Sequence, residues 1–170
     1  MRPEIQEIAP GVVLLGRYSP YQVGAWVLRH GSEAALLEMP PSQAGQTAPW
    51  KDCEAYCRDE GLVVRWLLMS HGHIDHSFGY GQYRRSFPKA TLIVHRSFLD
   101  WYRRALFDRV FSSDVEELDL AGEPLILLHA PKHSPQDTLV LFRGTACMGD
   151  WSLGAHPDCN PLVSPRRKLR

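Results

Sequence analysis

The sequence predicts an α/β fold, and three observations support this prediction. Short apolar runs separated by turn residues follow one another near the start of the chain. One amphipathic segment comes next, and a further apolar run leads directly into a cluster of metal-ligand side chains. Strands that alternate with helices, with polar ligands on the loop that leaves a strand, are typical of α/β enzymes. With 170 residues, 44% of them hydrophobic and 22% charged, the chain has the size and composition of one globular domain.

The first part of the chain predicts a meander of strands followed by a helix. Glycine, serine and proline separate three short apolar runs, which is typical of successive strands. The next segment begins with Pro49 and has Gly61 near its C-terminal end, as helices often do. On this helix Cys53 and Cys57 lie one turn apart, so we expect packed free thiols rather than a metal pair. The predicted strands cover residues 11–15, 22–28 and 33–37, and the predicted helix covers residues 49–60.

The rest of the chain predicts more strands than helices. The first of these strands is a mostly apolar run that begins with two valines, as expected of a buried strand. The predicted strands cover residues 63–69, 91–94, 115–119, 124–130, 138–143 and 145–149, and the predicted helices cover residues 79–87 and 97–106.

A cluster of four potential transition-metal ligands directly follows a predicted strand, at residues 71–76. In an extended segment, side chains two residues apart share a face, so His71 and His73 can converge on one ion. Asp75 and His76 are adjacent in sequence, and are better placed to reach a second ion beside the first. A polar loop rarely has this density of ligands by chance. The spacing therefore predicts a two-metal site.

These residues resemble the hallmark of the metallo-β-lactamase superfamily, His-x-His-x-Asp-His after an apolar strand, which residues 71–76 match in full. Two further segments carry the resemblance. Residues 125–135 are similar to a strand that leads into a Pro-Gly-His-Thr-Pro type loop, and residues 147–150 are similar to a strand that ends in Gly-Asp. Their order and spacing agree with the family over most of residues 5–155.

The resemblance implies ligands for two metal sites. His133 would be the third histidine of the first site, although His129 competes with it on position alone. Asp150 would bridge both metals. The implied first site is His71, His73, His133 and Asp150, and the implied second site is Asp75, His76 and Asp150.

The resemblance also implies the fold, a four-layer αββα sandwich of two similar halves. Family members carry one further histidine well downstream of the bridging aspartate. Here only His156 follows Asp150, and it lies too close to match that position. Lys132 stands where the family usually has glycine, and Gln136-Asp137 stands where Gly-His is common, so the loop around the third histidine is expected to differ in shape.

The second half is therefore expected to be incomplete, in a truncated or frame-altered member of the family. We expect one domain of this type over residues 1–160. Residues 161–170 lack periodicity and gather positive charge, which predicts a basic, disordered tail.

The resemblance implies a hydrolase in which a metal-activated hydroxide attacks the substrate. The family's hydroxyacylglutathione hydrolases suggest a small ester or thioester. Asp75 is expected to be catalytic, because it would bind the second metal and orient the water. The expected cofactor is Zn²⁺, with two ions if the second site forms and one Zn²⁺ or Fe²⁺ otherwise. Two alternatives stay open: a mononuclear iron enzyme like the family's persulfide dioxygenases, and a truncated, noncatalytic remnant that binds metal.

Composition narrows the choice of partners. A formal net charge of zero gives no general field that would attract nucleic acid or an anionic membrane. No apolar run has the length of a membrane helix, and residues 1–7 lack the pattern of a signal peptide, so we expect a cytoplasmic protein. The expected partner is a small-molecule substrate, in a monomer or a homo-oligomer. Four cysteines do not make a disulfide framework in a chain of this size.

Overall fold

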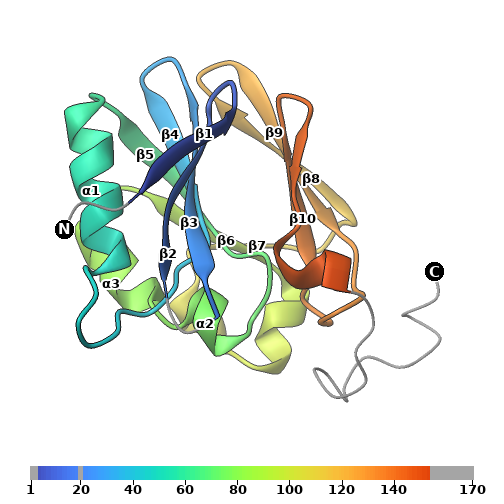
Figure 1. The fold of residues 1–170 in the computed structure, drawn as a ribbon. Helices are drawn as coiled ribbons and strands as arrows, with labels where there is room; N and C mark the ends of the chain where they lie inside the picture. The colour runs from blue at the N-terminus through green and yellow to red at the C-terminus, as the bar shows by residue number, and fades with distance from the viewer. Residues whose placement is uncertain (1–3, 19–20, 154–170) are drawn as a thin grey trace.

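The computed structural model describes residues 4–18 and 21–153. Two β-sheets pack face to face, and two helices cover the outer face of the larger sheet (Figure 1). The predicted α/β class is confirmed. Helices, larger sheet and smaller sheet are three layers of the expected αββα sandwich, and the second half contributes a four-stranded sheet within the described residues.

The larger sheet has seven strands in the order of the chain. Strands β1 to β4 pair antiparallel, and in the tight turns after β1 and β3 Gly11 and Gly31 adopt positive φ angles of 78° and 53°. Strands β4 to β7 pair in parallel, because longer connections carry the chain back before each strand. The strands are β1 (Ile5–Ala9), β2 (Val12–Tyr18), β3 (Val23–His30), β4 (Glu33–Leu37), β5 (Val63–Leu68), β6 (Thr91–His95) and β7 (Arg109–Phe111).

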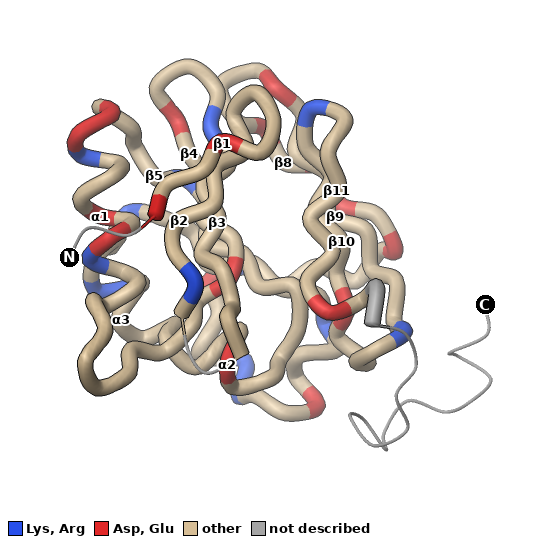
Figure 2. Tube along the Cα trace, in the orientation of Figure 1, with Lys and Arg blue, Asp and Glu red and all other residues tan. Residues whose placement is uncertain are grey.

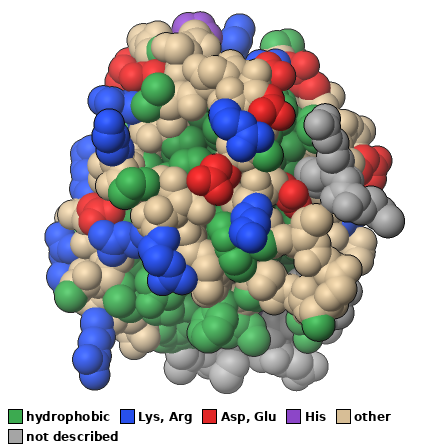
Figure 3. Space-filling model, turned by 90° about the vertical axis from the view of Figure 1, so that its left-hand side faces the viewer, with side chains coloured by type: hydrophobic (Ala, Val, Ile, Leu, Met, Phe, Trp, Pro, Cys, Tyr) green, Lys and Arg blue, Asp and Glu red, His purple; other side chains and the backbone are tan. Residues whose placement is uncertain are grey.

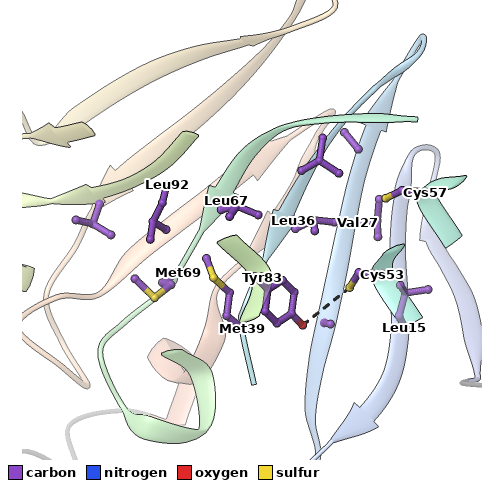
Figure 4. Close-up of a cluster of buried hydrophobic side chains, with 14 of the residues drawn as sticks. Leu15, Val27, Leu36, Met39, Cys53, Cys57, Leu67, Met69, Tyr83 and Leu92 are labelled. Atoms are coloured by element: carbon purple, nitrogen blue, oxygen red, sulfur yellow. Dashed lines mark hydrogen bonds between the residues drawn. The ribbon is translucent and has the colours of Figure 1, made fainter. Parts of the chain in front are cut away.

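Helices α1 (Pro49–Asp59) and α3 (Tyr80–Ser86) bury an apolar face against this sheet. Figure 4 shows the resulting core, in which Cys53 Sγ lies 3.9 Å from the hydroxyl oxygen of Tyr83. Cys53 and Cys57 are buried free thiols, as predicted from their spacing. This core fixes the helices on one side of the sheet and leaves the other side for the second sheet.

The smaller sheet is antiparallel, with the strand order β11-β10-β9-β8. Its inner face packs on the larger sheet through a second apolar core, which includes Leu37, Leu68, Leu127 and Val140. The strands are β8 (Val115–Leu120), β9 (Glu123–His129), β10 (Thr138–Phe142) and β11 (Thr145–Cys147).

The helix predicted at residues 97–106 is wrong. This segment forms two 3₁₀ turns, η1 (Arg96–Asp100) and η2 (Arg104–Leu106). Between them, the Tyr102 hydroxyl donates a hydrogen bond to the Gly72 carbonyl oxygen at 2.8 Å. The segment therefore packs on the loop that carries the metal-ligand residues, and this tertiary contact replaces a continuous helix.

The sequence did not predict strands β1 and β7 or the short helix α2 (Ile74–Ser77) inside the ligand cluster. The strand predicted at residues 145–149 ends at Cys147, and the 3₁₀ turn η3 (Gly149–Leu153) follows it. The tail predicted at residues 161–170 lies outside the described residues, and so does His156.

Surface charge is mixed. Acidic and basic positions are interspersed along the chain (Figure 2), and on the face covered by α1 and α3 charged side chains of both signs lie among apolar ones (Figure 3). This distribution agrees with the net charge of zero. In the part of the chain that the structure describes, every helix is too short or too polar to span a bilayer.

Candidate metal centre

The ligand cluster sits where β5 ends, at the edge between the two sheets. His71 and His73 follow the strand, and His73 is still extended, with φ −67° and ψ 147°. Helix α2 begins at the next residue and carries Asp75 and His76. The chain thus leaves the extended state between the two pairs of ligands, which turns the second pair toward a different point in space from the first.

Three histidines converge at the first point. His71 Nε2 lies 3.0 Å from His73 Nδ1, and His133 Nε2 lies 3.2 Å from the same nitrogen. His133 comes from the loop between β9 and β10. One nitrogen of each ring lies within 4.8 Å of the others, close enough to bind one ion.

A second group lies beside the first and shares His71 with it. His76 Nε2 is 3.5 Å from Asp150 Oδ1 and 3.6 Å from Asp75 Oδ2. The other oxygen of Asp150 lies 3.7 Å from His133 Nε2 and 4.0 Å from His71 Nε2. The Asp150 carboxylate therefore lies between the two groups, which is the place that the resemblance implied for a bridging ligand.

The structure thus brings together all six residues named from the sequence, and it separates the competing histidine from them. His129 stacks on His95, with ring centroids 3.5 Å apart, and its Nε2 lies 3.0 Å from the Pro135 carbonyl oxygen. Its ring takes part in this second histidine pair, whereas His133 faces the ligand cluster.

Burial and neighbouring charge set the protonation of the cluster. Burial and the adjacent histidines lower the pKa of His71 well below its usual value, and burial also lowers the pKa of His73. Burial lowers the pKa of His76 as well, but the charges of Glu38 and Asp150 outweigh it and raise that pKa to about 10. The hydrogen bond from His76 in turn lowers the pKa of Asp150. Metal binds neutral imidazoles and ionised carboxylates, so His71, His73 and Asp150 favour binding and an ion at His76 would displace its proton.

Two buried polar residues hold these ligands, and neither was singled out from the sequence. Glu38, directly after β4, is only 2% exposed and has a positive φ of 70°. Its Oε1 lies 3.2 Å from His76 Nδ1, and its Oε2 accepts a hydrogen bond from the Ser70 backbone N–H at 3.3 Å. The Ser70 hydroxyl lies 2.9 Å from His71 Nδ1. Glu38 and Ser70 each contact the Nδ1 atom of a histidine, so Nε2 of His76 and of His71 faces the centre. The only signal in the sequence is an acidic residue at the end of an apolar strand.

The loop around His133 is held by Asp137, which stands where the family often has histidine. Its carboxylate accepts hydrogen bonds from the backbone N–H groups of Lys132 and Ser134, both at 2.9 Å. Burial raises the pKa of this carboxyl. Asp137, which departs from the family pattern, thus stabilises the loop that carries His133 through these two hydrogen bonds.

The residues present fit a transition metal. Three imidazole nitrogens and a carboxylate are the donor types that zinc and iron(II) bind. Buried His133 Nδ1 has no hydrogen-bond partner within the described residues, and its Nε2 points to the centre. Buried neutral imidazoles whose ring nitrogens face one another leave lone pairs without a donor, and a bound cation would satisfy them.

The sequence model described as the metallo-beta-lactamase superfamily matches residues 18–161. The chain belongs to this superfamily. Two curated relatives are similar to it. A hydroxyacylglutathione hydrolase of Prochlorococcus marinus is 28% identical over 88 residues, which cover 52% of this chain and 34% of the relative. A lactamase-like protein of Pestalotiopsis microspora is 21% identical over an alignment of 180 residues, gaps included. The alignment covers 98% of this chain and 53% of the relative. The chain thus spans about a third and about half of these proteins.

Solved structures of metallo-beta-lactamases share the fold of this superfamily member. GOB-18 from Elizabethkingia meningoseptica has a TM-score of 0.65 at 17% identity, and the match covers 84% of this chain and 58% of that one. The class B3 di-zinc enzyme LRA-12 from an Alaskan soil metagenome has a TM-score of 0.64 at 13% identity, and the match covers 85% of this chain and 61% of that one. At these identities, the likeness establishes the fold.

Proposed function

We propose that this superfamily member is a metal-dependent hydrolase of a small ester or thioester. The observation that carries the proposal is the position of the Asp150 carboxylate, 3.7 Å from His133 Nε2 on one side and 3.5 Å from His76 Nε2 on the other. A carboxylate between two groups of imidazoles suits a pair of neighbouring cations. The curated relative named as a hydroxyacylglutathione hydrolase supports the substrate class.

The proposed resident metal is Zn²⁺, with two ions per chain. A bound zinc ion supplies Lewis acidity and lowers the pKa of coordinated water to about 7. The proposed ligands of the first ion are His71, His73, His133 and Asp150, and those of the second ion are Asp75, His76 and Asp150.

Asp75 is the proposed catalytic residue. Its carboxylate lies 3.6 Å from His76 Nε2 and lines the groove beside the centre, so a substrate in the groove would meet it. From this place the carboxylate can accept a hydrogen bond from the attacking water and hold the released proton at Oδ2. It can then give the proton to the leaving group, which a thiolate or alkoxide requires. No serine or cysteine nucleophile is needed in this scheme.

Metal content and turnover test the proposal together. After exposure to zinc and dialysis, the purified chain should retain about two ions, and Asp150→Asn should lower this number. Asp75→Asn should reduce kcat on the best substrate of a thioester, lactone and phosphodiester panel at least about 100-fold. Asp59→Asn, on the exposed end of α1, serves as the control. A chain that retains no zinc, or turns over none of these substrates, would contradict the proposal and favour the noncatalytic remnant.

One observation favours a second candidate, the persulfide dioxygenase type. His71, His76 and Asp150 form a group of two histidines and one carboxylate within 4.8 Å, which is a ligand set that suits mononuclear iron(II). Retention of one iron per chain and oxygen consumption with a persulfide would select this candidate over the hydrolase. The cytoplasmic location and the small-molecule partner stay predictions.

A further inference from the structure

A groove of about 520 Å³ opens beside the candidate metal centre. Residues of β1 and β3 line one side of it, and residues of β11 and of the turn that follows line the other. This volume lies in the range of about 300–1,000 Å³ that small-molecule sites occupy.

The walls of the groove are apolar and partly exposed to water. Ile8, Trp26 and Leu37 come from the larger sheet, and Ala146 and Met148 come from the end of the smaller one. Ile8 is 46% exposed and Met148 is 38% exposed, although both point into a concave surface. Covering such side chains with an apolar ligand removes their surface from water, which favours binding.

Charge is confined to one end of the groove. Its charged lining residues are Glu38, Asp75 and Asp150, together with His76, and these belong to the candidate centre or brace it. Among the described lining residues there is no lysine or arginine. A ligand with its own carboxylates would thus find no cationic side chain along the walls to pair with them. Electrostatic complementarity therefore selects a neutral ligand body.

We propose that this groove binds a neutral, unbranched acyl chain, with the reacting carbonyl at the end formed by Asp75, His76 and Asp150. The substrate class is then a medium-chain acyl thioester or ester with an uncharged leaving group. This inference rests on the proposed hydrolase function and narrows its substrate class. The curated relative is named for a hydroxyacyl thioester of glutathione, and this groove does not favour a polar hydroxyacyl group or the charged glutathione.

A series of acyl chain lengths tests the proposal. The metal-loaded full chain is assayed with N-acetylcysteamine thioesters from acetyl to octanoyl, whose thiol is uncharged. Each added CH₂ that enters the groove should raise kcat/KM about two- to fourfold. Glutathione thioesters of the same acyl groups should show no advantage over the N-acetylcysteamine series.

Two variants locate the effect in the groove. Thr145 is a half-buried lining residue on the edge strand β11 and shares a face with Cys147, so Thr145→Phe adds bulk on the groove side and should lower the octanoyl-to-acetyl ratio of kcat/KM at least tenfold. Met148→Ser makes one wall more polar and should lower the same ratio. Val115→Phe, at a 54% exposed position on the opposite edge strand β8, is the matched control and should leave the ratio unchanged.

Binding to the metal-free protein separates this inference from the hydrolase proposal. Calorimetry with hexanamide and octanamide should give a lower Kd for the longer amide, and Thr145→Phe should remove the difference. If the chain hydrolyses thioesters but neither kcat/KM nor Kd depends on chain length, the groove proposal is overturned and the hydrolase stands. A chain-length effect on Kd without turnover would overturn the hydrolase and keep the groove. Absence of both turnover and chain-length dependence would overturn both.

Discussion

Glu38 shows how a residue outside the ligand set can control it. Its carboxylate is almost completely buried, and Oε1 lies 3.2 Å from His76 Nδ1. A buried carboxylate that holds the far nitrogen of an imidazole fixes both the tautomer and the ring orientation of that ligand. The residue also holds a positive φ of 70°, a strain that its contacts with His76 and the Ser70 N–H offset.

Replacement of Glu38 by glutamine should weaken metal binding. The amide keeps the size of the side chain but removes the negative charge beside His76, so we expect the metal affinity to fall about 10- to 100-fold. Competition with a chromophoric chelator measures this affinity. Glu54→Gln, at an exposed position on α1, is the control. Equal affinities in the two variants would show that Glu38 does not position His76.

His95 leads to a second prediction, which concerns how the free energy of unfolding depends on pH. Burial, His129 and Arg96 lower the pKa of His95 to about 4, although Asp114 opposes the shift. A histidine in the unfolded chain has a pKa of about 6.5. Between these values the unfolded chain binds more protons than the folded one, so stability decreases as the pH falls from about 6.5 toward 4.

Replacement of His95 by asparagine should remove part of this pH dependence and keep an acceptor for the Ser97 N–H. Between pH 7 and pH 5, the free energy of unfolding of the unaltered chain should fall by about 1 kcal/mol more than that of the variant, after allowance for solvent screening. Urea unfolding of the metal-free proteins at both pH values measures the difference. Parallel pH profiles would contradict the prediction.

At the residue scale, the sequence could show the ligands but not what supports them. The positions of His71 and His73 follow from the two-residue period of an extended chain, which is local information. The contact between Glu38 and His76 depends on how β4 packs beside α2, and no spacing in the sequence encodes it. The choice of His133 over His129 needed the resemblance, because His129 ends β9 and His133 follows it in the next loop, only a few residues apart in sequence.

At the scale of elements, strands and helices with a clear apolar pattern were predicted well. The helix at Pro49–Asp59 and the strand at Val63–Leu68 have such patterns and end within about one residue of the prediction. The segment at residues 97–106 carries aromatic residues at near-helical spacing, but Tyr102 bonds to the metal loop and interrupts the helix. Strand Ile5–Ala9 is exposed almost throughout, so it lacks the alternation that marks a half-buried strand.

The connection after β11 is the element that holds Asp150 in place, and Gly149 is its tightest point. This glycine has a positive φ of 52°, and a Cβ there would overlap the Ser70 hydroxyl and lie 3.3 Å from Glu38 Oε1. A side chain at this position would thus push the end of the smaller sheet away from the end of β5.

Gly149→Ala should therefore destabilise the protein more than Gly144→Ala. Gly144 also has a positive φ, of 77°, but a Cβ there would meet no atom within 4 Å. Both variants carry the backbone strain of about 1–2 kcal/mol, and only Gly149→Ala adds the steric overlap, for a further loss of about 1–3 kcal/mol. Denaturant unfolding gives the two free energies. Equal losses would show that η3 shifts freely to accommodate the methyl group.

For the whole molecule, the candidate centre is a junction between the two halves. His71, His73, Asp75 and His76 follow β5 of the larger sheet, whereas His133 and Asp150 come from loops of the smaller sheet. The two sheets otherwise meet through one apolar core. A metal held by ligands from both sheets binds the folded chain only, because the unfolded chain does not bring these residues together.

Metal binding should for this reason raise the thermal stability of the entire domain. At a free metal concentration of 100 times Kd, binding to the folded state alone adds about 2.7 kcal/mol. For a chain of this length, each kcal/mol shifts Tm by about 2–4 °C, so zinc should raise Tm by about 5–11 °C, and a chelator should reverse the shift. His133→Ala removes a ligand from the smaller sheet and should abolish most of the shift, even though the ligands on the larger sheet remain. Calorimetry of both proteins with and without zinc measures it. If the variant kept the full shift, the ion would be held by the larger sheet alone, and the centre would not join the two halves.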